Sequence, residues 1–267
     1  MFDEYLRKWY LVPDGAPLMT HSSRLLPVRQ NGTAAMLKIA VEPEEKFGGQ
    51  LMVWWDGQGA ARVLAHEGDA LLLERACGEM SLLALSHEGR DEDATRILCA
   101  SVAELHRPHN KPLPELIPLT RWFVALFPAA GRYGGLFVAC AVTARELLTH
   151  PQEEVVLHGD IHHQNILDFG ERGWLAIDPK RLWGERGFDY ANIFCNPDEA
   201  IATDRKVFRR RLDIVTEAAR FERKRLLQWI LAWSGLSAAW SLDDGDSGAL
   251  ALAVAAMAAE ELSRLGE

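Results

Sequence analysis

Three polar residues in one short part of the chain have the types and spacing of a phosphoryl-transfer site. Asp160 ends the sequence His-Gly-Asp, Asn165 follows five residues later, and Asp178 comes after a short apolar run. In such a site one carboxylate receives the proton of an acceptor hydroxyl, while an asparagine and a second aspartate hold magnesium against the nucleotide phosphates. The spacing therefore predicts Asp160 as the catalytic base and Asn165 and Asp178 as ligands of Mg²⁺.

The same part of the chain allows two other interpretations. A polar loop rich in His and Asp can be an ordinary surface turn. It can also be a metal cluster, with candidate ligands His158, Asp160, His162, His163 and Asp168. Neither alternative accounts for Asp178 at a strand end or for a lysine far upstream. We therefore favour a kinase over a metallohydrolase or a non-catalytic loop.

The upstream lysine is Lys38, in the middle of an apolar stretch. A buried ammonium group needs an anionic partner, because burial without one is costly. Kinases carry such a lysine on a strand of the small lobe, where it holds phosphates of ATP. The expected partner lies on the next helix and is Glu42, Glu44 or Glu45, and spacing alone does not choose among them.

Two further segments are expected to contact ATP. Glu74, Arg75 and Ala76 end an apolar strand, and the backbone at this point would pair with the adenine edge. The sequence contains neither a G-x-x-x-x-G-K-[ST] phosphate loop nor a G-x-G-x-x-G motif. A hairpin that includes Ser22 and Ser23 is therefore expected to cover the phosphates.

Hydrophobic patterns place these residues in two lobes. Short apolar runs with turn signals such as Asn31-Gly32 predict strands in the first part, with one helix over 42–55. Helical periodicity predominates after residue 77, following a hinge, with a proline-rich connector over 108–118. We expect an α+β protein with a small β-rich nucleotide-binding lobe (1–76) and a larger, mainly helical lobe (77–267) that carries the catalytic and metal loops.

The amino-acid composition limits which kinds of binding partner are expected. The 267 residues include 29 Lys and Arg against 38 Asp and Glu, a net charge of −9. This charge disfavours nucleic acid as a partner and suits a cationic small molecule.

The four cysteines are scattered and form no C-x-x-C pair, which favours a reducing compartment. Without a signal-peptide pattern or a long apolar run, we expect a cytoplasmic protein with no membrane partner. Nothing in the sequence indicates an oligomeric state.

Taken together, these residues resemble the aminoglycoside phosphotransferases, which are small-molecule kinases with a protein-kinase-like fold. The segments 54–63, 157–165, 172–179, 188–194 and 235–240 are similar to the branch of streptomycin 6-kinases and hydroxyurea phosphotransferases. Protein kinases themselves fit less well, because Gly159 stands where they carry Arg and Pro179 follows Asp178.

The resemblance implies ATP and Mg²⁺ as cofactors and an aminoglycoside as the acceptor, with the 6-hydroxyl of streptomycin expected to be phosphorylated in an antibiotic-resistance reaction. It also implies that Glu45 is the partner of Lys38. Asp189 and Glu185 are candidate substrate contacts, although Asp189 equally fits a support for the catalytic loop. The rival functions are a kinase for another small alcohol and a kinase-like protein that binds without turnover.

Arg181 departs from the branch, which usually has glycine at this position. Together with Lys180 it is expected to place two cations beside the metal loop, where Arg181 would repel a cationic acceptor.

The tryptophans Trp229, Trp233 and Trp240 are spaced along one helix and are expected to lie in the core rather than to form a platform for substrate.

Overall fold

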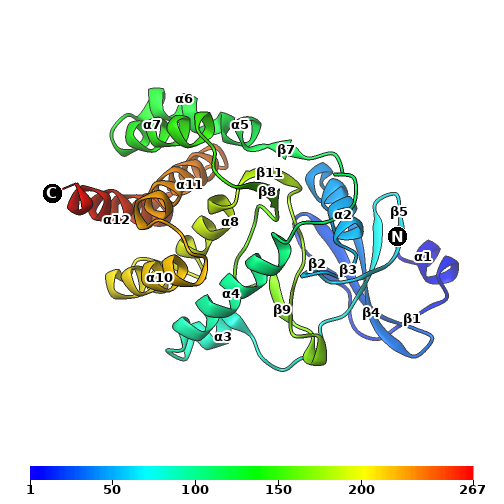
Figure 1. Cartoon of the computed structure of the whole chain (residues 1–267). Helices are drawn as coiled ribbons and strands as arrows, with labels where there is room; N and C mark the ends of the chain where they lie inside the picture. Colours follow the sequence, from blue (N-terminus) through cyan, green and yellow to red (C-terminus); the bar gives the residue numbers. More distant parts are fainter. Residues whose placement is uncertain (267) are drawn as a thin grey trace.

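The computed structural model describes residues 1–266, and the side chains of residues 43–47 lie outside this description. The N-terminal part is one antiparallel sheet of six strands with the order β1-β3-β4-β6-β5, in which β2 pairs with β3 (Figure 1). The elements of this lobe are α1 (Asp3–Lys8), β1 (Leu11–Pro13), β2 (Leu18–Met19), β3 (Ser23–Gln30), β4 (Thr33–Ala40), α2 (Pro43–Trp55), β5 (Val63–Glu67) and β6 (Ala70–Glu74).

Local sequence explains the register of the central hairpin. Asn31 and Gly32 have φ of 49° and 83°, which is the left-handed backbone that a two-residue hairpin turn requires. Gln30 and Thr33 are the first pair of the β3–β4 ladder. Because side chains alternate between the faces of a strand, this register places Leu37 and Lys38 on opposite faces.

The two faces of the sheet have different neighbours. Leu37 and Leu72 lie in an apolar cluster with residues of α1. Lys38 pairs in register with Leu71, whose face packs against α2 and the core of the rest of the molecule. The sheet therefore presents Lys38 toward the C-terminal lobe.

Two adjacent glycines let α2 approach both lobes closely. A Cβ on Gly48 would lie 2.3 Å from the carbonyl oxygen of Pro179, and a Cβ on Gly49 would lie 2.9 Å from Leu71. A larger residue at either position would clash with Pro179 or Leu71, which explains why two glycines stand in this helix although glycine weakens helices. The predicted helix over 42–55 is confirmed as α2.

The chain passes from β6 to α3 between Glu74 and Leu82, and the expected lobe division at 76/77 falls in this connection. The helices that follow are α3 (Leu82–His87), α4 (Asp91–Leu105), α5 (Leu119–Trp122), α6 (Leu126–Tyr133), α7 (Leu136–Thr149), α8 (Gly187–Ala191), α9 (Glu199–Ala202), α10 (Arg205–Ala218), α11 (Arg223–Asp243) and α12 (Ala249–Leu265), with 3₁₀ turns η1 (Phe123–Ala125), η2 (Gly170–Arg172) and η3 (Asn192–Cys195). Short strands β7 (Ile117–Pro118), β8 (Glu154–Leu157), β9 (Ile166–Asp168), β10 (Trp174–Ala176) and β11 (Leu182–Glu185) lie between them and form a pair, β9 with β10, and a three-stranded sheet, β7-β11-β8.

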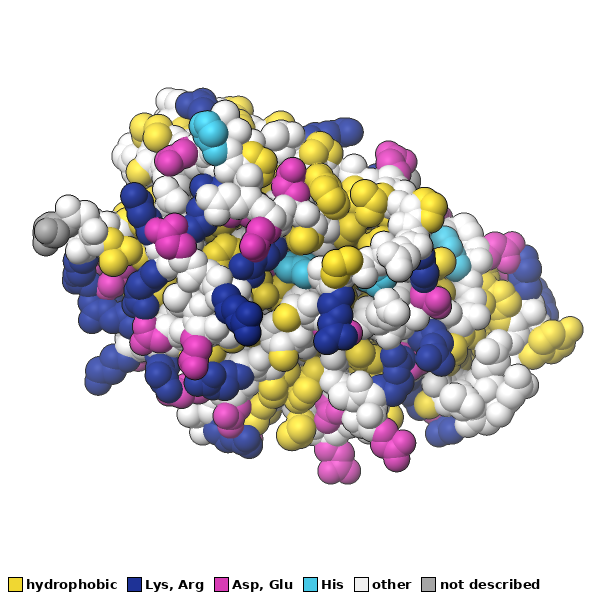
Figure 2. Space-filling view, viewed as in Figure 1, with side chains coloured by type: hydrophobic (Ala, Val, Ile, Leu, Met, Phe, Trp, Pro, Cys, Tyr) yellow, Lys and Arg dark blue, Asp and Glu magenta, His cyan; other side chains and the backbone are white. Residues whose placement is uncertain are grey.

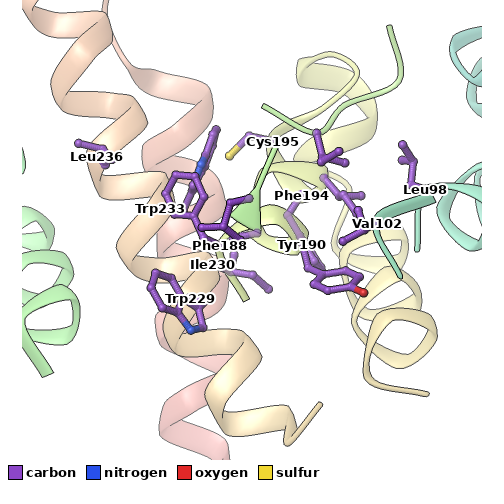
Figure 3. Close-up of a cluster of buried hydrophobic side chains, with 14 of the residues drawn as sticks. Leu98, Val102, Phe188, Tyr190, Phe194, Cys195, Trp229, Ile230, Trp233 and Leu236 are labelled. Atoms are coloured by element: carbon purple, nitrogen blue, oxygen red, sulfur yellow. The ribbon is translucent and has the colours of Figure 1, made fainter. Parts of the chain in front are cut away.

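Helix α11 is the centre of the helical lobe, with α7, α8 and α12 packed around it. Figure 3 shows Trp229, Ile230 and Trp233 of α11 beside Phe188 of α8. The rings of Phe188 and Trp229 meet edge to face at 6.2 Å between centroids. This packing fixes the position of α8, which contacts the loop between β8 and β9.

On the face shown in Figure 2, acidic and basic side chains are mixed. Lys and Arg side chains gather over α10, where Arg205 and Arg209 pair with Glu260 and Glu261 of α12. Among the described residues, no helix combines the length and hydrophobicity needed to span a bilayer.

Candidate active site

The catalytic loop connects β8 to β9 and carries Asp160 with its side chain about one-third exposed. Two amide groups orient this carboxylate. Asn165 Nδ2 donates to the Asp160 carbonyl at 2.9 Å and to Oδ2 at 3.3 Å, and Asn192 Nδ2 donates to Oδ1 at 3.1 Å. Asn196 in turn donates to Asn192. The result is a carboxylate in a set direction with access to solvent, as a base for an acceptor hydroxyl needs.

The carboxylate of Asp189 holds the backbone of the catalytic loop by hydrogen bonds. Its two carboxylate oxygens accept from the backbone N–H of His158 at 2.9 Å and of Gly159 at 2.7 Å, and His106 Nε2 lies 2.8 Å from Oδ2. The side chain is 1% exposed. The expectation that Asp189 contacts substrate is therefore wrong, and its alternative role as a support is the one observed.

Glu185 is also buried, at 2% exposure. Its carboxylate accepts from the Arg225 guanidinium at 2.6 and 2.9 Å, from Trp229 Nε1 at 2.6 Å and from the backbone N–H of Gln152 at 2.8 Å. These bonds hold β11 to α11 and use both carboxylate oxygens. The expectation of a substrate contact is wrong here too.

The metal loop follows β10. Asp178 has φ of 60°, a left-handed conformation that is strained for a residue with a side chain and that occurs preferentially at functional sites. The backbone N–H of Ile177 donates to the Asn165 carbonyl at 2.9 Å, which ties this loop to the catalytic loop. The amide of Asn165, directed by its bonds to Asp160, and the carboxylate of Asp178 supply the hard oxygen donors that suit Mg²⁺.

Lys38 reaches across from the sheet to the metal loop. Its ammonium group is 2.7 Å from Asp178 Oδ1, and the lysine is 4% exposed. The two residues, 140 positions apart, also line a small cavity with Met52 and Leu73. The structure thus brings together the lysine and aspartate that the sequence singled out. The expectation for Glu45 falls on the segment whose side chains are not described.

The histidines of the catalytic loop are dispersed. His158 Nε2 lies 2.8 Å from the Ile177 carbonyl, and Nδ1 accepts from the backbone N–H of Asp160 at 3.2 Å. Burial lowers the pKa of His158, although Asp189 and Asp160 oppose this shift, so its ring is neutral near pH 7. Within residues 1–266 as described, no three His, Cys, Asp or Glu side chains converge on a metal position. The cluster interpretation therefore has no geometric support.

The segments expected to contact ATP differ in how exposed their side chains are and in which residues they contact. Ser22 lies in the β2–β3 turn, whereas Ser23 begins β3 and is 2% exposed, so its hydroxyl is not on the surface of the hairpin. Glu74 at the end of β6 pairs with Arg172 and accepts from the backbone N–H of Arg62. Its side chain therefore joins the lobes, while the expected contact of the Glu74 backbone with the adenine edge stays a prediction.

Arg75 pairs with Asp14 at 2.6 Å, so its guanidinium points to the start of the sheet. The backbone of Arg75 and Ala76 continues to be the expected contact for the adenine edge.

A cavity of about 630 Å³ adjoins Asp160 on the side of the helical lobe. It is lined by Ile117, Arg121, Trp122, Val124, Gly159, Asp160, Lys180, Trp233, Trp240, Asp243 and Asp244. Trp233, Trp240 and Asp243 lie along α11, and Trp122 and Trp240 meet edge to face at 5.6 Å. Sugar-sized ligands bind in cavities of this volume. We call it the acceptor cavity.

The acceptor cavity changes the interpretation of the tryptophans. Trp229 is a core residue, as expected. Trp233 and Trp240 also form part of the cavity wall, so the core interpretation was incomplete for these two.

The acceptor cavity also corrects the expectation for Arg181. Arg181 is 7% exposed, and its guanidinium donates to the Glu115 carbonyl at 3.2 Å. It is Lys180 that lines the cavity. The φ of Arg181 is 51°, which explains why glycine suits this position in similar sequences.

A family model described as aminoglycoside/hydroxyurea antibiotic resistance kinase matches residues 8–245. The chain belongs to this family. Streptomycin 3″-kinase from Klebsiella pneumoniae is 52% identical over 262 residues, which cover 95% of this chain and 98% of the relative. Streptomycin 6-kinase from Streptomyces griseus is 32% identical over 256 residues, which cover 89% and 81%. The protein is thus a small-molecule phosphotransferase of the aminoglycoside kinase family.

Solved structures agree on the fold of this kinase. A thermostable mutant of aminoglycoside phosphotransferase APH(4)-Ia, in ternary complex with ADP and hygromycin B, superposes with a TM-score of 0.67 at 14% identity and covers 96% of each chain. The expected protein-kinase-like fold is confirmed.

Two sequence blocks that carried the resemblance prove to touch in this kinase. The backbone of Ala61 and Gly59 bonds to Ala176 of β10 at 2.9 Å in each case, and Arg172 donates to the Gly57 carbonyl at 2.7 Å. The blocks at 54–63 and 172–179 therefore form one junction between the lobes, next to Asp178.

Asn192 is a contact of Asp160 that sequence reasoning missed. It lies in the block 188–194, which was used only as a sign of resemblance, and no spacing rule connects it to Asp160. Its role becomes visible only when α8 and η3 are folded under the catalytic loop.

Proposed function

We propose that this protein transfers the γ-phosphoryl group of ATP to a hydroxyl group of streptomycin, with Mg²⁺ as cofactor. The acceptor cavity is the observation that carries the proposal. It has Asp160 in one wall and Asp243 and Asp244, at the end of α11, in another. Carboxylates and aromatic rings are the groups that attract guanidinium and ammonium ions, and streptomycin carries both kinds of cation.

The reaction follows from the placement of Asp160. The acceptor oxygen attacks the γ-phosphorus, the bond from phosphorus to the β-phosphate oxygen breaks, and the acceptor proton passes to Asp160. Asn165 and Asn192 hold the carboxylate in position, which matters because this chemistry depends mainly on positioning. Lys38 offsets negative charge on the nucleotide phosphates.

Mg²⁺ would be held by Asn165 and Asp178, whose loops the Ile177–Asn165 bond keeps together. When bound, the ion neutralises phosphate charge. ATP would lie between Lys38 and the backbone of Arg75 and Ala76, under the hairpin that carries Ser22. The structural neighbour in complex with ADP supports a nucleotide as the donor.

The degree of identity to the two streptomycin kinases guides the choice of hydroxyl group. The streptomycin 3″-kinase is 52% identical and the 6-kinase 32%. We therefore propose the 3″-hydroxyl, in place of the 6-hydroxyl expected from the sequence blocks. The 6-hydroxyl is the second candidate.

The test is ADP release with streptomycin, other aminoglycosides, hydroxyurea and simple alcohols, followed by mass spectrometry and NMR of the product. Streptomycin should gain one phosphate at the 3″ position, and omission of Mg²⁺ should stop the reaction. Turnover with an uncharged alcohol but not with streptomycin would favour a kinase for another small molecule. Binding of nucleotide with no turnover on any acceptor would indicate a binding protein.

A further inference from the structure

The segment 178–180 runs between two cavities. Asp178 lines the small cavity that contains Lys38, whereas Lys180 lines the acceptor cavity that contains Asp160. A phosphoryl group that moves from nucleotide to acceptor has to cross the border between these cavities. Lys180 lies at this border, on the acceptor side.

The backbone of Lys180 is fixed beside the catalytic loop. Its N–H donates to the His158 carbonyl at 2.6 Å. Its Cβ lies 3.0 Å from the position of a Cβ on Gly159, the residue before Asp160. The side chain therefore starts against the catalytic loop and is only partly exposed.

We propose that Lys180 is a catalytic residue whose ammonium group binds the phosphoryl group during transfer. This rests on the proposed phosphoryl transfer at Asp160. As the bond to the β-phosphate breaks and the bond to the acceptor forms, negative charge spreads over the equatorial oxygens. Lys38 serves the nucleotide side, and Lys180 serves the acceptor side. A cation at this border would only hinder a cationic acceptor, so an anion is the ligand that suits it.

The neighbouring Arg181 cannot serve in this way, because it is buried and turned toward Glu115. The proposal therefore assigns different tasks to two adjacent cations. Lys180 contacts the reacting group, and Arg181 holds the connector before β7.

The experiment compares Lys180→Met with Lys180→Arg, which keeps the charge. Lys206→Met, on the exposed side of α10, removes one lysine far from the cavities as a control. Each variant is measured for kcat and KM with ATP, Mg²⁺ and streptomycin, and for binding of ADP, Mg²⁺ and aluminium fluoride, which imitates the planar phosphoryl group. Thermal unfolding is followed in parallel, and Lys180→Gln replaces the Met variant if that variant does not fold.

Lys180→Met should lower kcat about 100-fold, the usual loss when one donor to a transition state is removed. Binding of the ADP–fluoroaluminate complex should weaken by a similar factor, while ATP affinity changes less than about threefold. Lys180→Arg should recover most of the loss, and Lys206→Met should match the parent protein.

A kcat within about threefold of the parent, with a lower KM for streptomycin, would overturn the proposal and leave Lys180 as a merely repulsive charge. If no aminoglycoside is phosphorylated, the proposed acceptor is wrong. The ADP–fluoroaluminate comparison still decides the role of Lys180 in that case, because it needs no acceptor.

Discussion

At the scale of single residues, Asp160 is held by amide donors instead of by a cation. Asn192 and Asn165 each donate one bond to its carboxylate, and Asp189 accepts from the backbone N–H of Gly159, the residue before Asp160. These bonds fix the direction of the carboxylate, which in the proposed reaction faces the acceptor hydroxyl.

Replacing Asp160 by Ala should lower kcat by about 10²–10⁴-fold, because the loss removes general-base catalysis. ATP affinity should stay within about tenfold, since the carboxylate faces the acceptor and not the nucleotide. Asn192→Ala should give a smaller loss in kcat, because it disturbs only the orientation of Asp160. Steady-state kinetics together with nucleotide titrations check both variants. Near-parental turnover of Asp160→Ala would remove Asp160 from its role.

His163 gives a second prediction, on stability. Burial lowers its pKa to about 3, and the charge of Arg211 adds to this. The unfolded chain, with a histidine pKa of about 6.5, binds the proton more readily, so stability present near neutral pH is lost as the pH falls below that value. Between pH 7.5 and 5 this should cost about 2 kcal/mol.

His163→Leu should reduce that pH dependence by a similar amount in urea unfolding at the two pH values. An unchanged difference between pH 7.5 and 5 would mean that other groups cause the acid sensitivity.

At the scale of elements, close approach between helices depends on small residues. A Cβ on Gly235 of α11 would lie 2.3 Å from Cys140 Cβ of α7. Gly131 of α6 has no heavy atom within 4 Å of the corresponding position. The same substitution should therefore have opposite effects at these two helical sites.

Gly235→Ala should destabilise the protein by about 1–3 kcal/mol, because a packed interface must shift. Gly131→Ala should stabilise it by about 0.4–1 kcal/mol, because alanine lowers the entropy of the unfolded chain. Denaturant unfolding measures both free energies. A loss at Gly131 equal to that at Gly235 would show that helix packing is not the cause.

At the scale of the whole molecule, the net charge of −9 and the carboxylates of the acceptor cavity act in the same direction. Both attract a cationic acceptor, but they respond differently to salt. The general field is screened over about 8 Å at physiological ionic strength, whereas a contact between partly enclosed charges is screened less.

We expect the KM for streptomycin to rise with salt, while that for ATP changes less in relative terms. The double variant Asp243→Asn, Asp244→Asn should raise the streptomycin KM by about tenfold, equivalent to about 1.4 kcal/mol. Its slope against salt should be shallower. Glu217→Gln is a suitable control, since it removes a carboxylate from an exposed part of α10. An equal effect of both changes would point to the general field alone.

The sequence by itself pointed to the proposed chemistry and to much of the secondary structure. Asp160, Asn165, Asp178 and Lys38 could be proposed as site residues because their spacing reflects local geometry, a loop between two short strands and a lysine within a third. The strands β3, β4, β5 and β6 and the longer helices followed from periodicity and from turn residues such as Asn31-Gly32, which act over a few positions, whereas the short helices α1, α3 and α9 were not predicted. The family resemblance followed from blocks that are contiguous in the chain.

Only the tertiary structure decided which polar residues face the cavities. Asp189, Glu185 and Ser23 looked available in the sequence but are buried, whereas Asp243 and Lys180 line the acceptor cavity and the buried Asn192 bonds to Asp160. Whether a side chain points into a cleft depends on how α8, α11 and the metal loop pack together, and these contacts join residues far apart in the chain. Local patterns carry no information about such pairings, so the acceptor side of the site could not be predicted from them.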